Sequence, residues 1–340
     1  MPVFSMERKT VSVIIPVHNG GENFRRCLQS LVESIPPPDE IIVVADGDSD
    51  GSWRMAKEFD TTILNIPAPG GPARARNMGA QMAKGNLLFF VDADVTIARD
   101  AVGLVIEAFE RDPDIAAVFG SYDDEPFETN FLSQYKNLFH HYVHQTSNVE
   151  ASTFWCACGA IQREIFLKMG AFDEGFRWPS VEDIELGYRL KRAGYRIKLL
   201  KNLKIKHLKH WGLGSLLKAD FFYRALPWTK LILKEGKFLD DLNLKISNRI
   251  SVVCVYLLIF ALLGSLYLPQ LLFLIFFLFV LLLVLNRDLY LFFKKKRGIF
   301  FMLKTIPWHW LYLFYSGLGF LIGFADYNVK RIRGKVFFER

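Results

Sequence analysis

The feature that constrains this chain most is a run of 36 residues, 250–285, without one charged side chain. About 20 apolar residues cross the hydrocarbon layer of a bilayer, whereas one helix of this length would be roughly 54 Å long. The run therefore predicts a transmembrane hairpin of two helices, with its turn at residues 264–269 and with Asn248 and Asn286 at the interface. The alternative is a helical pair buried in a large soluble protein.

A second apolar and aromatic stretch covers residues 299–324 and contains Pro307. If it spanned the membrane, the basic tail at 330–335 would lie outside, against the positive-inside tendency. An interfacial or re-entrant segment avoids this, and Trp308 with Trp310 suits the level of the lipid headgroups. We therefore expect an interfacial segment, with a spanning helix as the alternative.

The N-terminal sequence MPVFSMERKTVSVIIPV lacks the apolar stretch of a secretory signal and runs directly into a strand, which predicts a cytosolic N-terminal domain. The basic run 294–297 places both ends of the hairpin on the cytosolic side, so we expect a multi-pass protein of the inner (cytoplasmic) membrane. The net charge of +7 gathers at 189–209, 294–297 and 330–335, which favours anionic lipid over nucleic acid as the partner. Four cysteines without metal-site spacing fit a reducing compartment.

Upstream of the hairpin, apolar runs typical of strands alternate with helical segments. Strands are expected within 11–20, 40–52 (closed by an Asp/Gly/Ser turn), 61–66 and 87–91. Helices are expected within 22–34, within 53–59, from the break at 70–72 up to Met82, and within 101–111. This alternation predicts an α/β fold with a mainly parallel sheet flanked by helices. Ligands of such sheets bind outside the carboxyl ends of the strands, where His18, Asn19, residues 46–50, Asp92 and Asp94 would meet.

The segment LLFFVDADV places Asp92 and Asp94 directly after a buried strand. Two carboxylates so close repel each other, and Mg²⁺ or Mn²⁺ shared with substrate phosphates would relieve the repulsion. Arg74, Arg76 and Asn77 follow a Gly-Gly-Pro break and could face a diphosphate at the same edge. A metal-bound diphosphate is a good leaving group. A solvated turn is the alternative reading of the Asp-x-Asp pair alone.

The segment SVEDIELGYRLKRAGYRI has the pattern of an amphipathic helix. Ser180 and Asp183 match a capping box, which would put Glu182 and Asp183 in the first turn of this helix. Asp183 is a candidate general base, and a capping role is the alternative.

Six segments in this order resemble glycosyltransferase family 2, whose members are inverting enzymes with a GT-A fold: VSVIIPVHN, DEIIVVADGDSDGS, GGPARARNMGA, LLFFVDADV, CGAIQREIFLKMGAFDEGF and EDIELGYRLKRAGYRI. The resemblance covers roughly residues 10–210. It implies that the donor of the reaction is a nucleotide-sugar. By the resemblance, the residues that bind this donor are Pro16, His18, Asn19, Asp46, Arg76 and Asp92.

The resemblance also implies roles for the acidic residues. Asp94 with Asp92 would hold the metal and the diphosphate, and His207 matches a histidine that approaches this metal in some relatives, with His210 as a rival. Asp183 would be the catalytic base, with Glu182 beside it.

The chain departs from the family pattern around the nucleoside. It has Ala45-Asp46-Gly47-Asp48 where the family often has Asp-Asp-Gly-Ser, and His18 replaces a common aromatic residue. The nucleotide therefore stays open beyond a preference for UDP.

These expectations divide the chain into a GT-A catalytic domain (1–212), an amphipathic interfacial linker (213–248), the transmembrane hairpin (249–286), and a basic loop with the third apolar segment and the basic tail (287–340). The predicted function is a metal-dependent, inverting glycosyltransferase. It would move a single sugar to a lipid or lipid-linked acceptor at the cytosolic face, as in assembly of the cell envelope. The alternatives are a processive polysaccharide synthase, whose Gln-x-x-Arg-Trp motif is missing here, a nucleotidyltransferase, and a non-catalytic nucleotide-binding scaffold.

Overall fold

The computed structural model describes residues 8–236 and 241–332, and these form two compact units. The first unit holds the residues up to Thr129 together with Ser147–His210, and the second holds Asn130–Thr146 with the chain from Trp211 onward. Helix α5 (Phe131–Thr146) thus belongs to the second unit, although it lies inside the range 1–212 that the sequence assigned to the catalytic domain.

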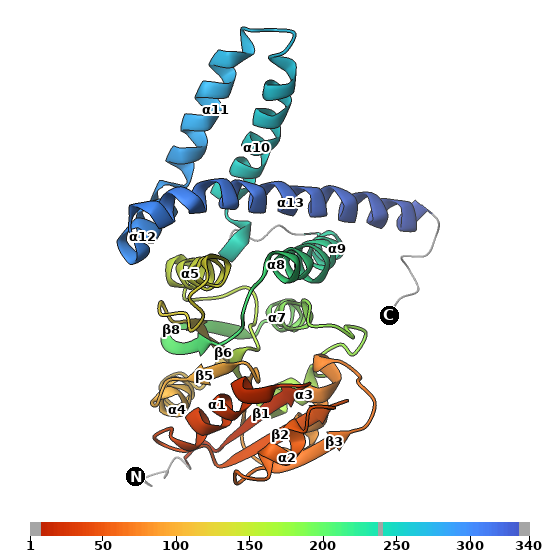
Figure 1. The fold of residues 1–340 in the computed structure, drawn as a ribbon. Coiled ribbons are helices and arrows are strands. Elements are labelled where there is room, and N and C mark those ends of the chain that lie inside the picture. The colour runs from red at the N-terminus through yellow and green to blue at the C-terminus, as the bar shows by residue number, and fades with distance from the viewer. Residues whose placement is uncertain (1–7, 237–240, 333–340) are drawn as a thin grey trace, which may run out of the picture. The chain divides into compact units, whose positions relative to one another are not determined.

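An eight-stranded sheet forms the centre of the first unit (Figure 1). Its strands follow the order β3-β2-β1-β4-β7-β6-β8-β5. Their bounds are β1 Val11–Val17, β2 Glu40–Asp46, β3 Thr62–Ile66, β4 Leu87–Val91, β5 Val95–Ile97, β6 Ile115–Tyr122, β7 Cys158–Gln162 and β8 Arg196–His207.

The sheet is parallel over β3-β2-β1-β4, as the alternation of strands and helices predicts. Beyond β4 it is mixed, because β7 runs antiparallel to both β4 and β6. Strand β6 pairs in parallel with β8, and the short β5 pairs antiparallel with the end of β8. The parallel half brings the carboxyl ends of β1, β2 and β4 to one edge.

Alternating side chains of the strands build two separate cores. Val11, Val13 and Ile15 of β1 belong to one core, whereas Ile14 belongs to the other, because successive side chains of a strand point to opposite faces. Helices α1 (Gly21–Val32), α2 (Ser52–Ala56) and α4 (Ala101–Arg111) contribute to the first core. Helices α3 (Pro72–Met82), α6 (Arg163–Lys168) and α7 (Glu182–Arg192) contribute to the second.

The described part of the second unit is helical. Its elements are α5, α8 (Leu213–Asp220), a π-helical turn (Phe221–Ala225), α9 (Leu226–Glu235), a 3₁₀ turn (Leu242–Leu244), α10 (Ile246–Gly264), α11 (Leu271–Leu285), α12 (Arg287–Arg297) and α13 (Ile299–Ile332). The predicted interfacial linker 213–248 thus corresponds to α8, the π-helical turn, α9, the 3₁₀ turn and the start of α10, and its residues 237–240 lie outside the described residues.

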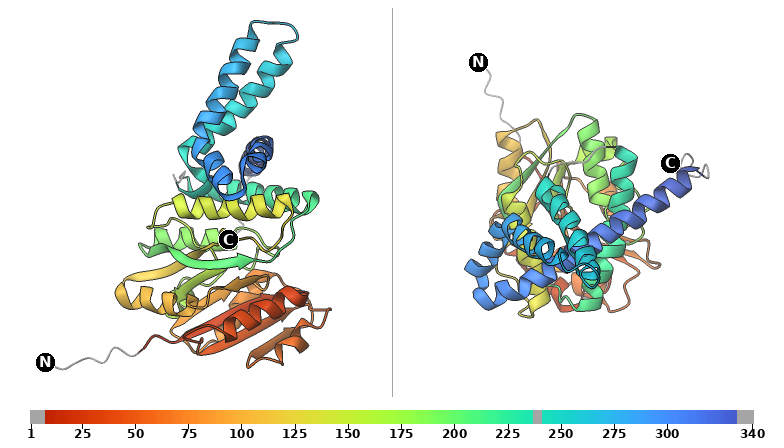
Figure 2. Two further views of the ribbon diagram at one scale, coloured as in Figure 1. Left: turned by 60° about the vertical axis from the view of Figure 1, so that its left-hand side comes forward. Right: turned by 90° about the horizontal axis from the view of Figure 1, so that it is seen from above.

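Helices α10 and α11 lie side by side as a hairpin, joined through residues 265–270, as the uncharged run predicts (Figure 2). Helix α10 is long and apolar enough to cross a membrane. Helix α11 reaches that length only together with α12, to which it is bent by 62°. Length and composition therefore support one spanning helix, or two if the bent pair counts as one span.

The segment after the hairpin differs from the expected basic loop. Residues 294–297 form the last turn of α12, where the negative end of the helix dipole favours cations. Residues 299–324 lie within the single helix α13, which includes Pro307 and does not pass the same length and apolarity test. Of the predicted basic tail, residues 333–335 lie outside the described residues.

The aromatic cluster behind β4 provides a test of the core. The ring of Phe90 is fully buried and lies 5.3 Å from the Phe166 ring and 5.1 Å from the Phe172 ring, centroid to centroid. We expect Phe90→Ala to lower the unfolding free energy of the first unit by about 3–5 kcal/mol, because it removes buried surface and leaves a cavity. Thermal unfolding followed by circular dichroism measures the shift. The matched control is Phe127→Ala at a ring that is 41% exposed, and an equal loss in both variants would contradict the packing described.

Candidate active site

Polar side chains follow β1 and β2 at the edge where both strands end. Pro16 lies in β1, and His18 and Asn19 come directly after the strand. Nδ1 of His18 is 2.7 Å from the carbonyl oxygen of Asp46. Oδ1 of Asn19 accepts hydrogen bonds from the amide of Ser49 at 2.8 Å and from its hydroxyl at 3.1 Å. The structure therefore brings together the loops after β1 and β2, where the donor was expected to bind.

The carboxylate of Asp46 holds the loop that leads into α3. Its Oδ1 accepts from the amide of Gly70 and its Oδ2 from the amide of Gly71, both at 2.8 Å. Gly71 has a φ of 93°, and a Cβ there would lie 2.3 Å from the carbonyl oxygen of Arg177, so only glycine fits this position. Asp46 thus has a structural bond on each oxygen, and a carboxylate retains further lone pairs for a ligand.

The guanidinium of Arg76 lies between two carboxylates. This side chain projects from α3 and is 4% exposed. Its Nη2 donates to Oδ1 of Asp92 at 2.7 Å, and its Nη1 donates to Oε1 of Glu182 at 2.9 Å. Among the described residues its buried Nε has no hydrogen-bond partner. Arg76 therefore joins the end of β4 to the start of α7.

Asp92 and Asp94 contact different basic side chains. Their side chains are 32% and 35% exposed, and while Asp92 bonds Arg76, Oδ2 of Asp94 lies 3.6 Å from Nε2 of His207. The antiparallel pairing of Val95 with His207 produces this approach. Burial raises the pKa of Asp94, but His207 and Lys209 outweigh it and lower the pKa to about 2. The repulsion expected between the two carboxylates is thus relieved in part by the protein itself.

His207 and His210, the two histidines considered for the metal, have different surroundings. The ring of His207 is buried and stacks on Tyr122 at a centroid distance of 4.8 Å, with Nε2 toward Asp94. His210 is exposed, and its Nδ1 lies 2.8 Å from Oε2 of Glu128. No group of three or more His, Cys, Asp or Glu side chains is arranged to hold a metal ion within residues 8–236 and 241–332. An ion at Asp94 would therefore need most of its ligands from substrate or water.

Asp183 lies in the first turn of α7, as predicted, but without the predicted capping box. The N-cap of α7 is Val181, whose apolar side chain cannot make a cap bond. The amide of Ser180 donates to Oε2 of Glu182 at 2.9 Å. Oδ2 of Asp183 accepts from the amide of Cys156 at 3.1 Å, and Oδ1 accepts from the amide of Ile184 at 2.8 Å. Burial, followed by the negative charge of Glu182, raises the pKa of Asp183 to about 6. A carboxylate with such a pKa is ionised near neutral pH and can still accept a proton.

Two residues at this site have roles that the sequence did not reveal. Asn77 was expected near a diphosphate, but it is buried, and its amide exchanges hydrogen bonds with the backbone of Phe172 at 2.9 Å each. The amide of Cys156 positions Asp183. Neither role has a sequence signal, because both depend on loops that approach α3 and α7 in the folded unit.

The buried pair of Arg76 and Glu182 makes a prediction about stability. We expect Arg76→Met to lower the unfolding free energy by about 3–5 kcal/mol, because Glu182 would remain buried without its cation. The double variant Arg76→Met/Glu182→Gln should regain much of this loss, since it removes the uncompensated charge. Melting temperatures of the three proteins at pH 7 measure both steps. A double variant no more stable than Arg76→Met would show that Arg76 acts through packing rather than through this pair.

Comparisons with known proteins agree with the geometry of the first unit. The family model described as Glycosyl transferase family 2 matches residues 12–170. The uncharacterized glycosyltransferase YibD of Escherichia coli (strain K12) is 36% identical over 111 residues, which are 31% of this chain and 32% of YibD. The uncharacterized glycosyltransferase YfnE of Bacillus subtilis (strain 168) is 24% identical over an alignment of 253 residues, and the match covers 58% of this chain and 64% of YfnE. The match thus spans less than two thirds of the length of each of these relatives.

A solved structure resembles most of the chain. The mannosyltransferase PcManGT from Pyrobaculum calidifontis, in complex with GDP-Man and Mn²⁺, superimposes with a TM-score of 0.58 at 18% identity and covers 93% of this chain and 88% of its own. At this identity the likeness concerns the fold. The sheet, the site at its edge and the family match lead to one conclusion: this chain contains a glycosyltransferase family 2 domain with a GT-A fold.

Proposed function

We propose that this protein is a membrane-anchored, inverting glycosyltransferase. It moves a single sugar from a nucleotide-sugar to a lipid or lipid-linked acceptor at the cytosolic face of the inner membrane. The observation that carries the proposal is the buried chain of contacts from Asp92 through Arg76 to Glu182, beside Asp183 with its raised pKa. This chain links the expected diphosphate site at the end of β4 to a base at the start of α7.

Asp183 serves as the base that takes the proton from an acceptor hydroxyl. Two backbone amides hold its carboxylate in place, and its pKa of about 6 lets it accept a proton near neutral pH. Glu182 supports this role through its negative charge, which raises the pKa of Asp183. Its own Oε1 accepts a hydrogen bond from Arg76. Arg76 orients Asp92, and both contact the donor.

The residues at Asp94 fit a divalent cation. The carboxylate is part exposed, stays ionised because of its low pKa, and faces Nε2 of His207. Mg²⁺ and Mn²⁺ are commonly held by one or two carboxylates plus substrate phosphates, which suits a site with few protein ligands. Asp94, with Asp92 and His207, would hold the ion, and the bound ion would neutralise charge on the departing diphosphate.

The nucleoside of the donor binds between the loops after β1 and β2. Pro16, His18, Asn19 and Asp46 lie there, and two hydrogen bonds join the loops: His18 bonds the carbonyl oxygen of Asp46, and Asn19 accepts from the amide of Ser49. We keep UDP as the preferred nucleotide. PcManGT was solved with GDP-Man, so a donor test must include both nucleotides.

The hairpin of α10 and α11 anchors the chain, and α8 with α9 lies at the bilayer surface. The apolarity of α10 and the basic last turn of α12 support this placement, because basic residues stay on the cytosolic side. A transferase anchored in this way has ready access to an acceptor in the membrane.

The function is tested by release of nucleoside diphosphate from a panel of UDP- and GDP-sugars, with Mn²⁺ or Mg²⁺, with and without membrane lipid extract. We expect release that requires both metal and lipid. Asp94→Ala should abolish it, and Asp183→Asn should lower the rate about 10²- to 10⁴-fold, the usual contribution of a general base. Mass spectrometry of the product should show a single added sugar.

The outcomes separate the alternatives. Loss only with Asp94→Ala would indicate an acceptor that is already ionised, such as a lipid phosphate. Products of many sugars would indicate a polymer synthase. Nucleotide binding without release from any donor would indicate a scaffold and refute the proposal.

The pKa of Asp183 predicts the dependence of the reaction on pH. Activity should fall about tenfold per pH unit below pH 6, because protonated Asp183 cannot act as a base. Glu182→Gln should move this acidic limb to lower pH, since it removes a charge that raises the pKa of Asp183. The matched control is Glu185→Gln in the same turn, whose carboxylate pairs with Arg189 at 2.7 Å. Profiles of kcat/KM from pH 4.5 to 8 give the positions, and equal limbs in all three proteins would assign the titration to another group.

A further inference from the structure

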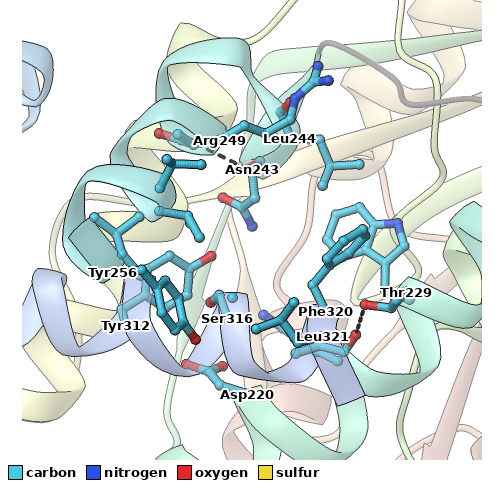
Figure 3. Close-up of a pocket in the computed structure, with 18 of the residues that line it drawn as sticks. Asp220, Thr229, Asn243, Leu244, Arg249, Tyr256, Tyr312, Ser316, Phe320 and Leu321 are labelled. Carbon is cyan, nitrogen blue, oxygen red and sulfur yellow. Dashed lines mark hydrogen bonds between the residues drawn. The ribbon is translucent and has the colours of Figure 1, made fainter. Parts of the chain in front are cut away.

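The second unit contains a pocket of about 630 Å³ that the site described above does not use (Figure 3). Its walls come from α5, α8, the π-helical turn, α9, the 3₁₀ turn before α10, α10 and α13. Apolar side chains provide most of the lining, and a few polar groups interrupt it. This volume and composition are typical of pockets that bury a small amphiphilic molecule.

One wall of the pocket is a face of the candidate membrane span α10. Its lining residues recur every three or four positions, which places them on a single face. Among them, Val253 is 57%, Leu257 47% and Phe260 67% exposed. If α10 crosses the bilayer, these exposed side chains contact hydrocarbon. A molecule that enters the pocket along this wall therefore arrives from the lipid phase.

The inner wall of the pocket carries charge. Nζ of Lys136 bonds Oδ1 of Asp220, and both residues are 5% exposed. The hydroxyl of Tyr315 donates to Oδ2 of Asp220 at 2.8 Å, so both oxygens of this carboxylate are engaged. A buried ion pair with its hydrogen bonds made is close to neutral as a unit.

Arg224 adds a positive charge that this pair does not balance. Its Nη1 lies 2.8 Å from Nε2 of His140, and within the described part of the chain it forms no ion pair with a carboxylate. Its charge reaches Lys136: burial together with Arg224 lowers the pKa of Lys136 to about 8, against the effect of Asp220. The lining thus has a surplus cation, and a guanidinium suits a phosphate through paired hydrogen bonds.

A further polar group of the wall has no hydrogen-bond partner among the described residues. Oδ1 of Asn243 is buried, and no described residue donates to it. Figure 3 shows the Asn243 amide directed into the pocket. An amide oxygen in this position can accept a hydrogen bond from a hydroxyl of a bound ligand. After a flip of the amide, the nitrogen can instead donate to a phosphate oxygen of such a ligand.

We propose that this pocket binds one membrane lipid whose headgroup is a phosphate, with the phosphate at Arg224 and the hydrocarbon chain along α10. The charge of Arg224 matches the phosphate, and the exposed apolar face of α10 matches the chain. The proposal deepens the function above and rests on it only where this lipid is taken as the acceptor.

Contact quenching by brominated lipid tests the binding without any donor. The full chain is placed in phosphatidylcholine nanodiscs, with phosphatidic acid or phosphatidylcholine brominated in the acyl chain as the probe. Trp228 lines the pocket, and the difference between wild type and Trp228→Phe isolates its fluorescence. We expect brominated phosphatidic acid to quench Trp228 at about tenfold lower mole fraction than brominated phosphatidylcholine, since a charged hydrogen bond contributes about that factor. Arg224→Gln should remove the preference, and Arg224→Lys should keep part of it.

The matched control is Lys230→Gln, which removes a cation from α9, the helix that follows the π-helical turn with Arg224, at a side chain that pairs with Asp326 outside the lining. This variant should keep the preference. Equal quenching by both lipids in the wild type, or a preference that survives Arg224→Gln, would overturn the proposal.

Competition identifies the kind of ligand. Unlabelled polyprenyl phosphate should displace the brominated probe, whereas inorganic phosphate at the same concentration should not, because the chain contributes most of the buried surface. Displacement by inorganic phosphate alone would refute a lipid site. Since the assay contains no nucleotide-sugar, its failure leaves the transferase function standing, and failure of the transferase assay leaves the lipid site standing.

Discussion

The candidate active site of the first unit depends on the two hydrogen bonds that the buried guanidinium of Arg76 makes to carboxylates. This side chain comes from α3, and it bonds Asp92 at the end of β4 and Glu182 at the start of α7. Those two carboxylates lie on elements far apart in the sequence, and each would be costly to bring near the other without a cation between them. Arg76 thus connects the end of β4 with the start of α7, where Asp183 directly follows Glu182.

The acidic residues of the site show how environment separates their chemistry. Asp94 faces His207 and has a pKa of about 2, which keeps it ionised, as the proposed cation site requires. Asp183 is buried beside Glu182 and has a pKa of about 6, which suits the proposed base. Burial raises the pKa of both aspartates; His207 and Lys209 outweigh this effect at Asp94, whereas the charge of Glu182 adds to it at Asp183.

The polar residues of the second unit differ in whether their charges are balanced. Lys136, Asp220 and Tyr315 form a satisfied buried network, while Arg224 contributes a charge that no described carboxylate balances. A surplus cation in an apolar wall is costly unless a ligand offsets it. The repeat of apolar residues along α10 does not predict this arrangement, because the charged residues and Tyr315 lie on other elements: α5, α8, the π-helical turn and α13.

The amino-acid sequence by itself determined the parallel half of the sheet and the helical hairpin, and it named the candidate site residues. Alternating apolar runs and turn residues are local signals, and the strand ending at Val91 and helix α4 lie where those signals put them. The tertiary structure alone decided the partners. His207 rather than His210 lies near Asp94 because β5 pairs with β8. The oxygens of Asp183 accept from the amides of Cys156 and Ile184, and the side chain of Asn77 bonds the backbone of Phe172. Pattern along a chain reports burial and turns, whereas the partner of a charged side chain depends on which distant segments the fold brings within hydrogen-bond reach.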